Sequence, residues 1–289
     1  MGTDTILLLS YSLAIFFVSM LGGKLSAIVT LTHTRTQLVM SVVAGFLLGV
    51  AMYHLLLHSL EDIPGPLANE TAIGFTVLGI ILIVVMLRIF RFHQHDFSHE
   101  AMEMHDHHHS DDDKENLMDV NPRSVMGIAL GLGLHTVTEG IALGASIRRG
   151  LVHDSEAILV GLSVFVAIMA HKPLDAYSII GLMRVSGYRE RTCKLANFGF
   201  ALLCPLITIL TFTGVGMMNQ LEELQIIGYI MAFSAGVFLC ISLGDLLPEI
   251  QFHSHDRGIL AAAFLLGIAL AYALFFFEYE IIHSMEHHH

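Results

Sequence analysis

Charged residues are scarce in this sequence. Asp, Glu, Lys and Arg make up 14% of the 289 residues, whereas a soluble domain carries about 25%. Hydrophobic residues make up 54%, and several apolar blocks reach the roughly 20 residues that a helix needs to cross the hydrocarbon layer. Little of the chain is then left to build a soluble core, so the composition excludes a soluble globular protein.

Basic residues and cysteines are also few. Lys and Arg number 14 against 26 Asp and Glu, and the formal charge of -12 argues against nucleic acid as a partner. The three cysteines, Cys193, Cys204 and Cys240, lack zinc-finger spacing and lie in or beside apolar segments, so no disulfide framework is implied. The first apolar block has no short basic start and no cleavage site, which predicts a retained helix rather than a signal peptide.

Eight apolar segments are long enough to be membrane spans, and we predict an all-α integral membrane protein. The predicted spans are 4–31, 36–60, 70–92, 123–147, 153–183, 190–217, 222–250 and 257–283. Turn signals separate them. Pro64-Gly65-Pro66 divides the second span from the third, and Arg148-Arg149-Gly150 divides the fourth from the fifth.

Histidine is abundant, with 19 residues. Many of these lie in a polar stretch from 93 to 121, whose low hydrophobicity and high charge predict a disordered loop. The terminal His287, His288 and His289 resemble an affinity tag and carry no functional weight. The predicted divisions of the chain are spans 1–3 in 1–92, the His-rich loop in 93–121, spans 4 and 5 in 122–185, and spans 6–8 in 186–289.

The placement of Lys and Arg predicts the orientation. Ten of these residues fall in loops on one side of the predicted membrane, and only Arg148 and Arg149 fall on the other. Because basic residues collect on the cytoplasmic side, both termini should lie outside and the His-rich loop inside. No organelle signal stands out, so we expect a multi-pass protein of the plasma membrane, or of the inner membrane in a bacterium.

Two spans of opposite direction resemble each other. The sequence AGFL at 44–47 in the second span matches AGVF at 235–238 in the seventh. This register also pairs polar residues: His54 with Asp245, and His58 with Glu249. The match predicts eight transmembrane helices in a 3+2+3 arrangement, with spans 1–3 and 6–8 as inverted repeats around spans 4 and 5, a common plan of secondary transporters.

Two pairs of ionisable residues lie near the middle of the fourth and fifth spans. His135 and Glu139 are four residues apart, as are His171 and Asp175, so each pair shares one helix face. Ionisable groups at that depth are costly and indicate function. If the two pairs face each other, their imidazoles and carboxylates suit Zn²⁺, Fe²⁺ or Mn²⁺ better than Ca²⁺ or Mg²⁺. The alternative is that they only form hydrogen bonds between helices.

The segment HTVTEGIALG, from His135 to Gly144, resembles the fourth-helix motif of the ZIP (Zrt/Irt-like) metal transporters. That motif pairs a His with an acidic residue that precedes Gly and small apolar residues. DLLPE, from Asp245 to Glu249, resembles the seventh helix of the family, and Ala44-Gly45 followed by His54 resembles the second. The eight spans, outside termini and His-rich loop also fit, so the resemblance covers nearly the whole chain.

The resemblance implies a metal site made of His135, Glu139, His171 and Asp175. It also implies uptake of divalent metal ions, zinc first, with Fe²⁺, Mn²⁺ and Cd²⁺ as further candidates. Some members hold two adjacent ions, and this sequence departs from them at three positions: Thr136 replaces an Asn, Lys172 replaces an Asp and Cys204 replaces a Glu. Because the ammonium of Lys172 would repel a second cation, we predict a single ion with Lys172 as counter-charge. Cys204 is either an auxiliary ligand or a small buried hydrophobe.

Further polar residues lie toward the two ends of the spans. We predict an entrance at His54 and His58 and an exit at Asp245 and Glu249; the alternative is helix ends solvated by lipid headgroups. The predicted mechanism is alternating access without enzymatic chemistry. An intramembrane zinc-dependent hydrolase and a passive metal-selective channel are the rival interpretations. The expected partners are metal ions and the lipid bilayer, with a homodimer left open.

Overall fold

The computed structural model describes residues 3–28, 33–90, 122–153, 161–246 and 257–286, and the regular structure of these residues is entirely helical. The helices are α1 (Thr3–Leu25), α2 (His33–Gly49), η1 (Val50–Leu56), α3 (Leu57–Asp62), α4 (Ala68–Phe90), α6 (Pro122–His153), α7 (Leu162–Val185), α8 (Glu190–Val215), α9 (Gln220–Ile241), η2 (Ser242–Leu246) and α11 (Arg257–Glu286). Because the π-helical turn η1 joins α2 to α3 and the π-helical turn η2 continues α9, the described elements form eight continuous helical segments, as predicted.

Long apolar helices make this chain a multi-pass membrane protein. Seven helical segments of the described residues are long and apolar enough to cross a bilayer. The segment that misses this criterion is α7, which carries Lys172, Asp175 and Arg184. Large apolar side chains face outward from the bundle, and Phe17 and Leu265 are 60% and 63% exposed. Such surfaces suit contact with lipid.

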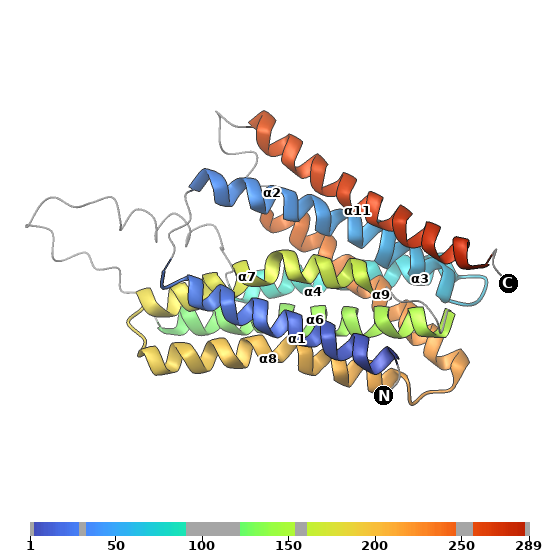
Figure 1. Cartoon of the computed structure of the whole chain (residues 1–289), viewed down its shortest axis with the longest axis horizontal. Helices are drawn as coiled ribbons and strands as arrows, with labels where there is room; N and C mark the ends of the chain where they lie inside the picture. The colour runs from blue at the N-terminus through green and yellow to red at the C-terminus, as the bar shows by residue number, and fades with distance from the viewer. Residues whose placement is uncertain (1–2, 29–32, 91–121, 154–160, 247–256, 287–289) are drawn as a thin grey trace, which may run out of the picture.

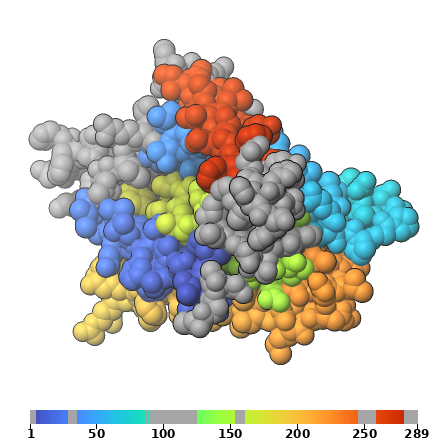
Figure 2. Space-filling model, turned by 45° about the vertical axis from the view of Figure 1, so that its right-hand side comes forward, coloured from blue at the N-terminus to red at the C-terminus, as the bar shows by residue number. Residues whose placement is uncertain are grey.

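The helices run along the long axis of the molecule (Figure 1). The most extensive contacts join α2 with α11, α4 with α9, α6 with α8, and α1 with α7. Figure 2 shows the red surface of α11 next to the blue surface of α2. The start of α1 and the end of α11 lie toward the same end of the bundle (Figure 1), as an even number of crossings requires.

The predicted break at Arg148-Arg149-Gly150 is wrong, because α6 continues through these residues to His153. The next helix begins only after Gly161, whose positive φ of 69° suits a residue without a side chain. Both arginines find acidic partners on other helices, Glu223 on α9 and Asp62 on α3. The two arginines that we predicted to lie in a loop are therefore paired with carboxylates inside the bundle. The His-rich segment 93–121 lies outside the described residues.

Two glycines bring pairs of helices into backbone contact. A Cβ atom at Gly45 of α2 would overlap the carbonyl of Phe264 in α11, and one at Gly236 of α9 would overlap the carbonyl of Thr76 in α4. A π-helical turn follows each glycine-bearing helix, η1 after α2 and η2 after α9. Such turns inside α-helices are uncommon and are frequent at functional sites.

Candidate metal centre

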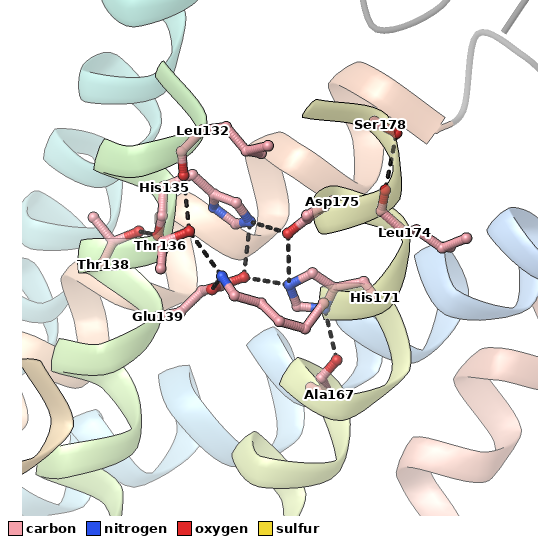
Figure 3. A network of polar contacts seen from close by, with 11 residues as sticks. Leu132, His135, Thr136, Thr138, Glu139, Ala167, His171, Leu174, Asp175 and Ser178 are labelled. Atoms are coloured by element: carbon pink, nitrogen blue, oxygen red, sulfur yellow. Dashed lines mark hydrogen bonds and ion pairs between the residues drawn. The ribbon is translucent and has the colours of Figure 1, made fainter. Parts of the chain in front are cut away.

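Helices α6 and α7 place four polar side chains at one point near their middles. The i,i+4 spacing sets His135 and Glu139 on one face of α6, and His171 and Asp175 on one face of α7. Figure 3 shows the four side chains pointing toward one another. All four are buried, with exposed fractions from 0% for Glu139 to 9% for Asp175. The structure thus brings together the predicted group in full.

The donor atoms of this group are close enough to share one ion. One ligand atom from each residue lies within 4.8 Å of all the others. Nε2 of His135 is 2.9 Å from Oε1 of Glu139 and 3.9 Å from Oδ2 of Asp175. Nε2 of His171 contacts the same Glu139 oxygen and lies 4.0 Å from Oδ2 of Asp175. The ligands of a tetrahedral Zn²⁺ ion lie about 3.4 Å apart, so these separations fit zinc after small side-chain shifts.

A backbone carbonyl orients His171 for ligation. Its Nδ1–H donates to the carbonyl of Ala167 at 2.6 Å, which leaves the lone pair of Nε2 directed at Glu139 (Figure 3). Ligating histidines generally use their second nitrogen in this way, because the hydrogen bond fixes both the tautomer and the ring orientation. His171 is therefore prepared to bind a metal through Nε2.

Asp175 has an unused acceptor inside the bundle. Among the described residues, its buried Oδ2 has no hydrogen-bond partner, although two imidazoles lie about 4 Å away. An unsatisfied buried carboxylate oxygen is costly, and a cation placed between it and the imidazoles would satisfy it. This is the feature expected of a metal ligand rather than of a hydrogen bond between helices.

Lys172 points into the same cluster and is fully buried. Its ammonium forms an ion pair with Oε2 of Glu139 and donates to Oγ1 of Thr136 at 2.7 Å. It also lies 4.7 Å from the ring centroid of Phe200, a cation–π contact. Glu139 thus offers one oxygen to the imidazoles and the other to Lys172. Thr136, predicted as a neighbour of the site, is the second anchor of the ammonium.

The other predicted residues do not belong to this group of donors. Cys204 is buried on α8 but does not belong to the convergent set of donors. His54 lies in η1 and His58 in α3, toward the end of the bundle that holds the start of α7. Asp245 belongs to η2, where only its backbone is described, and Glu249 lies outside the described residues.

Our sequence interpretation missed one acidic residue near the same end of the bundle as His54. Glu278 of α11 accepts hydrogen bonds from the backbone N–H and the hydroxyl of Ser163, at 3.1 Å and 2.6 Å, and pairs with His54. A signal was present, because Glu278 is an ionisable residue inside the last apolar segment. Its partners come from distant parts of the chain, and no local spacing reveals them.

Comparison with known proteins gives one consistent family. A family model described as "ZIP Zinc transporter" matches residues 90–274. The chain is 34% identical over 160 residues to "Zinc transporter ZIP9-B" of Xenopus laevis, covering 54% of this chain and 50% of the relative. It is 31% identical over 130 residues to "Zinc transporter ZIP9" of Macaca fascicularis, covering 44% and 53%. "Zinc transporter ZIP6" of Homo sapiens is 26% identical over 164 residues, covering 54% and 20%.

The chain thus spans about half the length of the ZIP9 relatives that it matches. The matched region includes α6 and α7, and with them all four residues of the convergent group. The resemblance of the fourth-helix segment is therefore confirmed by a match to more than half of the chain. This chain belongs to the ZIP zinc transporter family.

Proposed function

We propose that this protein carries a divalent transition metal ion, zinc first, across the bilayer, and that the ion binds at His135, Glu139, His171 and Asp175. The observation that carries the proposal is the convergence of two imidazoles and two carboxylates within 4.8 Å, buried midway along two membrane helices. Mixed nitrogen and oxygen donors suit zinc and its neighbours in the first transition row. The names of the relatives, all zinc transporters, support the same cargo.

Charge at the site favours one ion per chain. With neutral imidazoles, the two carboxylates and the Lys172 ammonium leave the empty site with one net negative charge, and a divalent ion changes this to one positive charge. A second divalent ion would face three positive charges on one ion and Lys172 in a medium that screens weakly. Lys172 also keeps the empty site closer to neutral, which lowers the cost of returning through the membrane without cargo.

Alternating access is the mechanism that the packing supports best. When Gly45 is aligned with Gly236, α2 corresponds to α9 and the turn η1 corresponds to η2. The packing partners also correspond, because α2 packs against α11 and α9 packs against α4. In this proposal, spans 1–3 and 6–8 are inverted repeats in a 3+2+3 arrangement, and α6 and α7 hold the ion between them. Rocking of one group of helices against the other then exposes the ion first to one side and then to the other.

The distribution of basic residues supports an orientation of the chain in the membrane. We place both termini outside the cell, and we assign His54 and His58 to the entrance and Asp245 and Glu249 to the exit. His58 supports this assignment, because its side chain is 24% exposed and pairs with the exposed Glu61 at 3.2 Å. We further propose that the protein lies in the plasma membrane and that it assembles as a homodimer.

A flux assay tests the site. The purified full-length chain in liposomes should take up ⁶⁵Zn²⁺ in a saturable manner, and His135→Ala combined with His171→Ala should reduce uptake at least about tenfold, because two of four ligands are lost. The exposed Lys194→Ala serves as control. Undiminished uptake by the double variant, with normal folding, would refute the site assignment.

Competition identifies the cargo and separates the rival mechanisms. Unlabelled Zn²⁺, Fe²⁺, Mn²⁺ and Cd²⁺ should compete with ⁶⁵Zn²⁺, while Ca²⁺ and Mg²⁺ should not, because imidazole ligands disfavour hard cations. Uptake should also weaken in acid, since protons compete for imidazole and carboxylate. A passive channel would instead show uptake that stays linear with concentration and depends weakly on temperature.

A further inference from the structure

Beyond the central site, a second imidazole and carboxylate, His54 and Glu278, form a pair inside the bundle. Nδ1 of His54 lies 3.1 Å from Oε2 of Glu278, and the two side chains are 4% and 19% exposed. His54 lies in the π-helical turn η1, and Glu278 lies on α11, which packs along the same span. This pair thus offers one imidazole and one carboxylate from two helices, whereas the central site offers two of each.

The hydrogen-bond partners of His54 favour a positive charge at the imidazole. Nε2 of His54 faces the carbonyl of Ala271 at 3.3 Å, and Nδ1 faces the carboxylate of Glu278. Both neighbours are acceptors, yet a neutral imidazole has only one N–H to donate. If Nε2–H donates to Ala271, the lone pair of Nδ1 opposes a carboxylate lone pair. A second proton on the imidazole removes the conflict, and so does a metal cation between these two atoms.

The arrangement repeats the chemistry of the central site. There too, a carbonyl holds one imidazole nitrogen of His171 and the other nitrogen is directed at a carboxylate. At the outer pair, Ser163 donates twice to the far oxygen of Glu278, which orients the near oxygen toward His54. Such supporting hydrogen bonds are typical of metal ligands. A spacing of 3.1 Å also fits two ligands of one zinc ion, which lie about 3.4 Å apart in tetrahedral geometry.

We infer that His54 and Glu278 bind a divalent transition metal ion on its way to the central site. This inference rests on the proposed transport and adds Glu278 as the partner of the entrance histidine. Two protein ligands, with water completing the shell, bind more weakly than four, as a site of passage requires. Ser163 precedes His171 on α7 by eight residues, so the two sites lie roughly 12 Å apart along the helix.

Anomalous diffraction from crystals of the full-length chain equilibrated with Zn²⁺ tests the inference directly. We expect one peak at the central group and a second between His54 Nδ1 and Glu278. Glu278→Gln and His54→Ala should each abolish the second peak and keep the first. Glu70→Gln, which changes an exposed carboxylate near the start of α4, should keep both.

Uptake kinetics provide a second readout. Glu278→Gln should raise the half-saturating Zn²⁺ concentration about fivefold and change the maximal rate little, because the central site stays intact, and Glu70→Gln should change neither. A central peak without an outer peak in the unmodified chain overturns this inference and leaves the proposed transport standing. Absence of the central peak would instead count against the transport site itself.

Discussion

At the scale of the residue, the central site is distinguished by the double use of Glu139. One carboxylate oxygen faces the two imidazoles, and the other forms an ion pair with Lys172. A buried lysine with no exposed surface needs such a partner, and Thr136 accepts a further hydrogen bond from it. In the proposed metal site, Lys172 therefore acts through its charge and not as a ligand, because an ammonium has no lone pair to offer.

Replacing Lys172 by Met keeps an unbranched side chain, one atom shorter, and removes the charge. Zinc should then stabilise the protein more than it stabilises the unmodified chain, because the filled site is now neutral and the empty site carries two negative charges. Two unit charges about 4 Å apart interact by about 4 kcal/mol at an effective dielectric constant of 20, so binding should tighten at least about tenfold. Melting temperatures with and without Zn²⁺ measure this.

Lys194→Met is the matched control, because it removes the charge of an exposed lysine that does not belong to the site. It should leave the zinc-induced shift unchanged. A smaller shift in Lys172→Met than in the unmodified chain would show that Lys172 supports binding rather than opposing it.

At the scale of the element, two adjacent arginines attach the C-terminal end of α6 to neighbouring helices. Arg148 pairs with Glu223 in the first turn of α9 and lies 5.4 Å from the ring centroid of Phe212. Arg149 pairs with Asp62 at 2.6 Å and with Glu61 at 2.7 Å. These contacts attach the helix that carries His135 and Glu139 to the second and seventh spans.

The Asp62 pair should contribute strongly to stability. Its carboxylate has no exposed surface, so Asp62→Asn leaves Arg149 with one fewer buried partner, and breaking a buried pair costs about 3–5 kcal/mol. The free energy of unfolding, measured by denaturant titration in detergent, should fall by an amount near the lower end of this range, because Glu61 still holds Arg149.

Glu190→Gln is the comparison for that variant. Its carboxylate is 54% exposed and pairs with Arg184 at 3.3 Å, and a solvent-exposed pair contributes about 0–1 kcal/mol. Equal losses of stability in the two variants would contradict the view that the buried Asp62–Arg149 pair stabilises the packing of α6.

At the scale of the whole molecule, local sequence patterns predict the helices but not the side-chain contacts between distant helices. Eight helical segments follow from apolar length, and the convergence on α6 and α7 follows from two i,i+4 pairs. The partner of His54 lies more than two hundred residues away on α11, and no spacing in the sequence reveals it. The sequence predicts a loop at Arg148 and Arg149, because their acidic partners, Glu223 and Asp62, come from other helices and leave no local signal.

The matched glycines allow a test of the repeat in the whole bundle. Gly45→Ala would place a Cβ against the carbonyl of Phe264, and Gly236→Ala would place one against the carbonyl of Thr76. Because both contacts are with backbone, neither can be relieved by a side-chain rotation, and overpacking of this kind costs about 1–3 kcal/mol. If α2 and α9 are equivalent members of inverted repeats, the two variants should lower the melting temperature by similar amounts.

Gly74→Ala is the control, because a Cβ atom at Gly74 meets nothing within 4 Å. It should leave the melting temperature unchanged or raise it slightly, since alanine favours the helix. A large loss in one variant and none in the other would show that the two glycines do not perform equivalent packing roles, and the repeat would then be a likeness of sequence alone.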